Sequence, residues 1–217
     1  SSGTIVTIAG NGAAGFTGDG VLATSTSLNQ PQSIACLNAC MNGEVYIADT
    51  GNHRVRKIIA DGTIVTIAGT GMSGYSGDGG LAVNAMLNTP VDVMVSGAGE
   101  VFISEEGNHV VRRINNGGII STFAGTPGVS GYSGDGGSAV VAWLNLPRGL
   151  TINSDAELLI ADTNNNVIRK VDNSGISTVV TGLLSPHGVT HGRDGELYIV
   201  EREGHQITKV DKNGRKI

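Results

Sequence analysis

The chain has 217 residues, 34 of them glycine, with one Trp, four Tyr, three Phe and a formal net charge of −5. Its length is typical of one domain or one repeat array. The glycines follow no Gly-X-Y period, which excludes collagen, and the interleaved Val and Ile runs exclude disorder. The negative charge gives no long-range positive field to attract nucleic acid, and no apolar run approaches the ~20 residues of a membrane span.

The first predicted element is an outer strand at Thr4–Ala9, followed by the glycine-rich stretch "AGFTGDGV" at residues 14–21. Pro31 then opens the short apolar stretch "QSIACL". Two further stretches, "VYIAD" at residue 45 and "HRVRKI" at residue 53, are β-branched or alternating and predict strands. A fourth predicted strand, "TIVTIAG", begins at Thr63 directly after the hairpin signal Asp61-Gly62.

This order of elements repeats along the chain. "VYIADTGNHRVRKI" at residue 45 returns in related form at residues 101, 158 and 197, and "SGYSGDGG" at residue 73 returns unchanged at residue 130. A leucine-rich solenoid would need shorter repeats with a leucine ladder. Four short antiparallel strands per repeat instead predict an all-β propeller with four visible four-stranded blades. The expected blade units are residues 31–68, 90–124, 147–181 and 186–217.

The last unit lacks the glycine-rich insert and stops after its third predicted strand. Two arrangements fit: Thr4–Ala9 completes the last blade and closes a four-bladed ring, or the chain is a piece of a ring of six or more blades. We expect the second. An open ring leaves Val- and Ile-rich blade faces uncovered, which predicts self-association or poor solubility of the isolated chain.

The segments "ADTGNHRVRKI" and "GYSGDGG", with the proline that opens each unit, resemble the NHL-repeat β-propellers. Asn52-His53 and Asn108-His109 match the first two letters of the signature for which the family is named. The variant is similar to repeats of teneurins and of microbial extracellular proteins. The resemblance covers nearly the whole chain and implies the propeller fold, whereas it says little about function.

The glycine-rich inserts carry recurring acids at Asp19, Asp78 and Asp135. A nucleotide site would need Gly-Lys-Ser/Thr or a G-x-G-x-x-G opening a βαβ unit, and calcium would need several carboxylates per copy. We therefore expect structural loop acids that accept hydrogen bonds from neighbouring loop amides. Short helices are expected at Leu81–Leu87, with Leu81, Met86 and Leu87 packed inward, and at Ala139–Leu144 with Trp143.

When the four units are aligned, one position holds an acid in every unit, and the position four residues later holds a histidine or an asparagine. Acid–base chemistry or zinc binding is one interpretation, but equivalent positions of successive blades lie apart on a ring. Local turn capping is the favoured role. These turn-capping residues are Asp49, Glu105, Asp162 and Glu201, with His53, His109, Asn166 and His205.

The inner strand of the last unit carries His187 and His191, which are weak candidates for a channel site together with Arg148. The resemblance implies that some related lyases hold zinc in the channel with histidines from different blades. The matching inner-strand positions here are Gln32, Val91 and Arg148, so that pattern does not carry over. No catalytic or metal-binding residue and no cofactor is predicted.

The predicted third strands are basic, and certain relatives bind RNA stem-loops on a positive propeller face. Alternation divides these bases between both faces of a blade, and aromatic stacking partners are few. We expect an ordinary solvated edge and no nucleic-acid partner. The bases concerned are Arg54, Arg56, Lys57, Arg112, Arg113, Arg169, Lys170 and Lys209.

The only cysteines, Cys36 and Cys40, lie in a hairpin from Pro31 to Val45 that is three residues longer than its equivalent from Pro90 to Val101. This predicts a small disulfide-closed loop and hence an extracellular or cell-surface location. The sequence as a whole predicts a non-enzymatic scaffold that binds a protein partner or self-assembles, with no small-molecule substrate. A channel-metal lyase or hydrolase and an RNA-binding domain are the alternatives.

Overall fold

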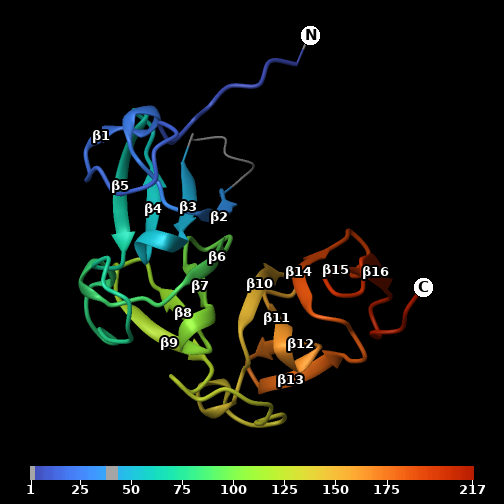
Figure 1. Ribbon diagram of the computed structural model, residues 1–217. Coiled ribbons are helices and arrows are strands. Elements are labelled where there is room, and N and C mark those ends of the chain that lie inside the picture. Colours follow the sequence, from blue (N-terminus) through green and yellow to red (C-terminus); the bar gives the residue numbers. More distant parts are fainter. Residues whose placement is uncertain (1–2, 38–43) are drawn as a thin grey trace.

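The computed structural model describes residues 3–37 and 44–217 and consists of four antiparallel sheets that follow one another around an open arc (Figure 1). Each sheet is one propeller blade, as the repeats predict, with strands in chain order from the centre outward. The β-branched strands pack their apolar faces against the neighbouring blades at the three internal interfaces. Blade 1 comprises β2 (Pro31–Ala35), β3 (Val45–Asp49), β4 (Arg54–Ile58) and β5 (Thr63–Ala68), with β1 (Val21–Leu22) added at its outer edge.

The remaining blades repeat this plan, except that the last has three strands. Blade 2 comprises β6 (Pro90–Val95), β7 (Val101–Glu105), β8 (Val110–Ile114) and β9 (Ile120–Ala124). Blade 3 comprises β10 (Pro147–Ile152), β11 (Leu158–Asp162), β12 (Val167–Asp172) and β13 (Gly175–Val180). Blade 4 comprises β14 (Pro186–His191), β15 (Leu197–Glu201) and β16 (Gln206–Val210).

Short 3₁₀ turns occupy two recurring places. One set follows the second strand of blades 1 to 3: η3 (Thr50–Asn52), η5 (Glu106–Asn108) and η7 (Thr163–Asn165). The other lies in the inserts that lead into these blades: η1 (Ala23–Ser25), η4 (Ala82–Asn84) and η6 (Ala139–Val141). We call residues 10–30, 69–89 and 125–146 insert 1, insert 2 and insert 3.

The inserts pack between blades, through Leu87 as predicted but not through Leu81 or Trp143. Insert 2 buries Ala82, Ala85 and Leu87 against blades 1 and 2, whereas Leu81 is 51% exposed. Insert 3 likewise buries Ala139, Ala142 and Leu144 and leaves Trp143 45% exposed. The expected helices are single 3₁₀ turns. Their tighter turn sets small side chains against the blade and directs the large ones outward.

The predicted strand at Thr4–Ala9 is absent from the structure. Residues 4–8 have no strand pairing, and Ile5 is fully exposed. A strand persists only where a neighbouring strand takes up its backbone hydrogen bonds, and no described strand lies beside this segment. Residues 4–9 therefore do not complete blade 4.

The arc stays open between blade 4 and blade 1 (Figure 1). The inner strands β2, β6, β10 and β14 lie toward the centre, and each packs beside the next in chain order. Each inner strand begins at a proline, and the residue before it has a positive φ: Gln30, Thr89, Leu146 and Ser185, between 49° and 53°. The same backbone conformation therefore recurs at the entrance of every blade.

Insert 3 starts from Gly125, where the backbone passes directly over the preceding hairpin. Gly125 has a φ of +95°, and a Cβ there would lie 2.4 Å from the His109 carbonyl oxygen, whereas Gly136 has a φ of +78° with nothing within 4 Å. Both alanine variants incur backbone strain of about 1–2 kcal/mol. We predict that Gly125→Ala lowers the free energy of unfolding by about 1 kcal/mol or more beyond Gly136→Ala, as measured by urea denaturation. Equal losses would show that this close approach does not constrain the fold.

Candidate functional site

Three arginines that the sequence predicts at a solvated edge are completely buried. Arg56, Arg112 and Arg169 occupy equivalent positions at the middle of β4, β8 and β12, and each has no exposed surface. Arg54, Lys57 and Arg113 on the same strands are partly exposed. These arginines are buried because one side of each third strand faces an acid on the second strand and the insert that precedes the blade. Burial of a guanidinium requires such partners.

In blade 2, Arg112 is held between an acid of the blade and an acid of the insert. Its Nη1 lies 3.3 Å from Glu105 Oε1 on β7, and its Nη2 donates to Asp78 and to the Ser76 carbonyl oxygen of insert 2. The ring of Tyr75 lies 4.6 Å from the guanidinium carbon. The guanidinium therefore receives charge, hydrogen bonds and a cation–π contact from one insert.

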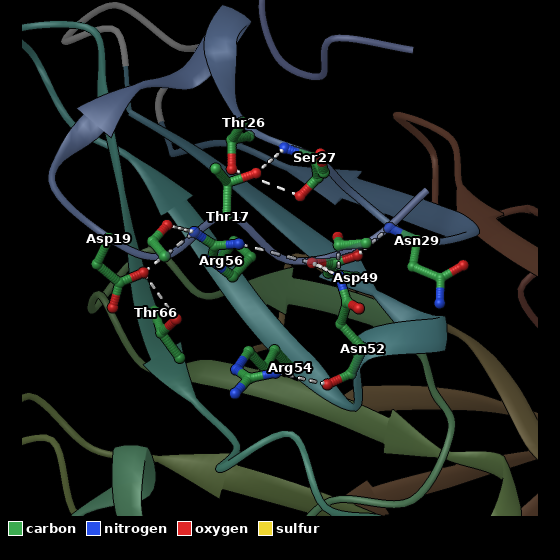
Figure 2. Close-up of polar contacts among 12 residues, drawn as sticks. Thr17, Asp19, Thr26, Ser27, Asn29, Asp49, Asn52, Arg54, Arg56 and Thr66 are labelled. Carbon is green, nitrogen blue, oxygen red and sulfur yellow. Dashed lines mark hydrogen bonds and ion pairs between the residues drawn. The ribbon is translucent and has the colours of Figure 1, made fainter. Parts of the chain in front are cut away.

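Blade 1 shows the same arrangement, drawn in Figure 2. Arg56 Nη2 donates to Asp19 at 3.0 Å and to the Gly18 carbonyl oxygen at 2.8 Å, and Asp49 lies 3.7 Å from Nη1. Phe16 takes the place of the tyrosine, 4.7 Å from the guanidinium. In blade 3, Arg169 pairs with Asp135 at 2.7 Å and with Asp162 at 3.4 Å, under the ring of Tyr132.

The insert acids therefore have a structural role, with partners other than the predicted loop amides. Asp78 also accepts hydrogen bonds from the Tyr75 hydroxyl and from the Thr122 backbone N–H on outer strand β9. Asp19 accepts from the Thr66 hydroxyl on β5. Each acid thus ties its insert to the third and the outer strand of the following blade.

A recurring asparagine, for which the sequence predicts no structural role, completes the attachment of each insert. The Nδ2 atoms of Asn52, Asn108 and Asn165 donate to insert carbonyl oxygens at 2.7, 2.9 and 2.7 Å. Each Nδ2 also donates to the acid three residues earlier. The asparagine occurs in the three units that have an insert, and this co-occurrence in the sequence indicates that it contacts the insert.

The acids at the ends of the second strands hold the entrance of their own blade. Asp49, Glu105, Asp162 and Glu201 are all buried. They accept the backbone N–H groups of Asn29, Asn88, Asn145 and Leu184, at 2.6 to 2.9 Å. These predicted turn-capping acids therefore lie at a turn, where each joins the end of the second strand to the segment just before the inner strand of the same blade.

The imidazole column connects one blade to the next. His53 and His109 have left-handed backbones at the end of their turns, and their Nδ1 atoms accept the N–H groups of Thr89 and Leu146 at 3.2 and 3.1 Å. Burial lowers the pKa of both rings, which favours the neutral form that can accept. Asn166 accepts from Ser185 in the same way.

Blade 4 lacks the insert and, with it, the residues that would contact an insert. Thr208 stands where the buried arginine stands elsewhere, and Gly204 replaces the asparagine. The Thr208 hydroxyl donates to Glu201, which keeps the blade acid paired in the absence of a guanidinium. Insert, arginine and asparagine are therefore lost together.

The two acids around the arginine of blade 2 differ in their titration. Burial raises the pKa of Glu105 to about 7, although Arg112 opposes the shift. Burial also raises the pKa of Asp78, but hydrogen bonds from Tyr75 and Thr122, together with the Arg112 charge, outweigh it and hold this pKa low. The insert acid is therefore the counter-ion that stays ionised at neutral pH.

A cavity of about 270 Å³ lies among the inner strands, where a propeller has its channel. His187 and Arg148 line it together with Gln32, whereas His191 is outside it and contacts the Gly192 carbonyl oxygen. Arg148 is paired with Glu106 at 2.7 Å. Burial and the neighbouring Arg148 charge lower the pKa of His187.

No group of three or more His, Cys, Asp or Glu suited to a metal ion occurs within residues 3–37 and 44–217. In the same part of the chain, no helix is long and apolar enough to cross a bilayer. Cys40 lies outside the described residues, so the Cys36–Cys40 disulfide stays a prediction.

The fold and the repeated blade contacts define a β-propeller of tandem repeats. A family model for the NHL repeat matches residues 28–58. The chain is 37% identical to NHL repeat-containing protein 2 of Bos taurus over 83 residues, 37% of this chain and 11% of that protein. It is 34% identical to Teneurin-4 of Homo sapiens over 97 residues, 38% of this chain and 4% of that protein. The chain therefore carries a match to the NHL repeat at residues 28–58 and is similar to NHL-repeat proteins over part of its length.

A third relative is Protein SUPPRESSOR OF QUENCHING 1, chloroplastic, of Arabidopsis thaliana, 29% identical over 156 residues, 68% of this chain. The chain spans 14% or less of the length of these relatives. Among solved structures, a streptogramin B lyase superposes with a TM-score of 0.62 at 20% identity, over 90% of this chain and 59% of that chain. A Bacteroides thetaiotaomicron protein of unknown function gives 0.65 at 18% identity, over 82% and 46%. These likenesses show the fold.

The raised pKa of Glu105 makes its contribution to stability pH-dependent. Between its unfolded value near ~4.3 and about 7, the folded chain keeps a proton that the unfolded chain has released, so this contribution falls as pH rises. The lowered pKa values of His53 and His109 act in the opposite direction over an overlapping range. Comparison with Glu105→Gln isolates the carboxyl group.

We predict that wild type loses stability relative to Glu105→Gln between about pH 5 and about pH 8, by about 1.4 kcal/mol per unit of pKa shift. Urea denaturation of both proteins at the two pH values measures this difference. Glu157→Gln, at a solvent-accessible ion pair with Lys170, is the matched control and should change little. A relative gain of wild-type stability with pH would contradict the burial-dominated titration of Glu105.

Proposed function

We propose that the chain is a non-enzymatic scaffold whose rigid arc of blades presents surfaces to protein partners. The observation that carries the proposal is that the recurring acids, arginines and asparagines of blades 1 to 3 are engaged in holding inserts and blade entrances. The acids and imidazoles that suggested acid–base or metal chemistry in the sequence make hydrogen bonds and ion pairs that hold the fold together. The NHL-repeat propeller supports a role in protein interaction.

The inserts provide an apolar surface for such contacts. Four large side chains of the inserts are exposed: Met72 and Leu81 on insert 2, and Val141 and Trp143 on insert 3. Exposed aromatic and aliphatic side chains grouped on rigid elements are typical of protein-binding surfaces.

A channel-metal lyase or hydrolase is the second candidate, favoured by His187 and Arg148 in the central cavity and by the lyase among the structural neighbours. Against it, the pairing of Arg148 with Glu106 leaves that guanidinium engaged, and His191 lies outside the cavity. RNA binding has less support, because the three buried arginines are out of reach of phosphates and Lys57, Arg113 and Lys170 are paired with neighbouring glutamates.

An extracellular or cell-surface location is part of the proposal and rests on the predicted Cys36–Cys40 disulfide. Alkylation of the purified chain with and without reductant tests it. Both cysteines should react only after reduction, and full reaction without reductant would remove the support for an oxidising compartment.

The scaffold and the metal enzyme differ in a measurable quantity. We predict that the purified chain holds no stoichiometric zinc or calcium after dialysis, because His187 and Asp92 are the only His, Cys, Asp or Glu residues that line the described cavity, which is too few for a metal site. Elemental analysis of wild type and of His187→Ala measures this, with His191→Ala as the control outside the cavity. One metal ion per chain, lost in His187→Ala and kept in His191→Ala, would overturn the scaffold and favour the enzyme.

A further inference from the structure

At each interface between consecutive blades, a side chain of the earlier blade accepts a backbone N–H of the later blade. The acceptor follows the 3₁₀ turn after the second strand, and the donor is the residue before the proline that opens the next inner strand. The three contacts are His53 Nδ1 with Thr89 at 3.2 Å, His109 Nδ1 with Leu146 at 3.1 Å, and Asn166 Oδ1 with Ser185 at 2.9 Å. We call them latch 1, latch 2 and latch 3.

Both sides of each latch have an unusual backbone. The three acceptors and the three donors all have a φ between 50° and 59°. This left-handed conformation is uncommon for residues other than glycine, and it persists only where the surrounding structure holds it. Each latch therefore joins a strained turn of one blade to the strained entrance of the next.

The three latches differ in their response to protonation. Nδ1 of a neutral imidazole accepts a hydrogen bond when the ring proton is on Nε2, whereas an imidazolium carries a proton on both nitrogens and can only donate. Protonation of His53 or His109 would therefore set one N–H donor against another. The Asn166 carboxamide does not titrate, so latch 3 keeps its acceptor in acid.

Few charged groups face the two rings. Arg54 lies beside His53, and its charge adds to burial in lowering the pKa of that ring. Glu106 opposes the effect of burial on the pKa of His109, but this carboxylate is paired with Arg148 at 2.7 Å. In the described part of the chain, neither ring donates to a carboxylate. An imidazolium would therefore gain no new partner in exchange for the lost N–H.

The later blade contributes one buried acid near each of these two latches. Glu105 accepts the N–H one residue before Thr89, and Asp162 accepts the N–H one residue before Leu146. Burial raises the pKa of Glu105 to about 7 and that of Asp162 to about 6, so both acids take up protons in the same pH range as the imidazoles. Variants at the histidines leave both acids in place and therefore separate the two effects.

We propose that His53 and His109 form an acid-sensitive connection between blades, in which latches 1 and 2 open when the rings are protonated while latch 3 stays closed. Blade 2 is then held less tightly by both of its neighbours, whereas blade 4 stays attached to blade 3. Because burial favours the neutral rings, their contribution to stability is present near neutral pH and is lost as pH falls below about 6.5. The arc is therefore more flexible in acid than at neutral pH.

Amide hydrogen exchange, followed by NMR on the 217-residue chain, tests each latch separately because each donor is a single backbone N–H. Protection factors, which correct for the pH dependence of intrinsic exchange, are compared at about pH 7.5 and about pH 5. We expect the protection of Thr89 and Leu146 to fall at least about fivefold in acid, as for the loss of one hydrogen bond. The protection of Ser185 should change less than about twofold.

The matched variants are His53→Asn and His109→Asn, since Asn166 shows that asparagine can hold the acceptor position. Each variant should abolish the acid-induced fall at its own latch and leave the other latch as an internal control. Circular dichroism checks that the variants fold. Ring nitrogen chemical shifts of wild type give a readout that needs no variant, and they should show Nδ1 of both rings unprotonated at about pH 7.5.

Four results would overturn the proposal: unchanged protection of Thr89 and Leu146 in acid, an equal loss at Ser185, a loss that persists in the asparagine variants, or neutral rings with the proton on Nδ1. A persistent loss would assign the acid response to Glu105 and Asp162. The proposed scaffold role is tested separately by the metal analysis, so either idea can fail alone.

Discussion

The structure depends on a guanidinium buried between two carboxylates. An arginine removed from water is strongly destabilising without counter-ions and hydrogen bonds, and Arg112 obtains them from Glu105 of its own blade and from Asp78 of the insert. Since the pKa of Asp78 is held low and that of Glu105 is raised, the insert provides the permanent charge. The glycine-rich insert is thereby part of the core of each blade that follows it.

This constraint explains why the features of a blade are present or absent as a set. Blade 4 has no insert, and there Thr208 and Gly204 replace the arginine and the asparagine. An arginine at position 208 would be buried with Glu201 as its only counter-ion, because blade 4 has no insert acid. The blade acid persists in all four blades because it has a second task, which is to accept a backbone N–H at the blade entrance.

The repeats predicted the blades and their strand order because period and alternation are local properties of a sequence. Burial of Arg112 was not predicted, since alternation shows which residues share a face but not what covers that face. The co-occurrence of arginine, asparagine and insert acid in three units, and their joint absence from the fourth, was the sequence signal. The exposure of Leu81 and Trp143 follows from a 3₁₀ turn in place of the expected helix, a difference of backbone that apolar composition does not reveal.

The central claim is most directly tested by a double-mutant cycle between Asp78 and Arg112, using Asp78→Ala, Arg112→Met and the double variant in urea denaturation. We predict a coupling free energy of about 1 kcal/mol or more, because the insert acid and the buried guanidinium stabilise one another. The partly exposed pair Lys170–Glu157 provides the reference, with coupling of about 0.5 kcal/mol or less. Additive losses at Asp78 and Arg112, within about 0.3 kcal/mol, would contradict the account.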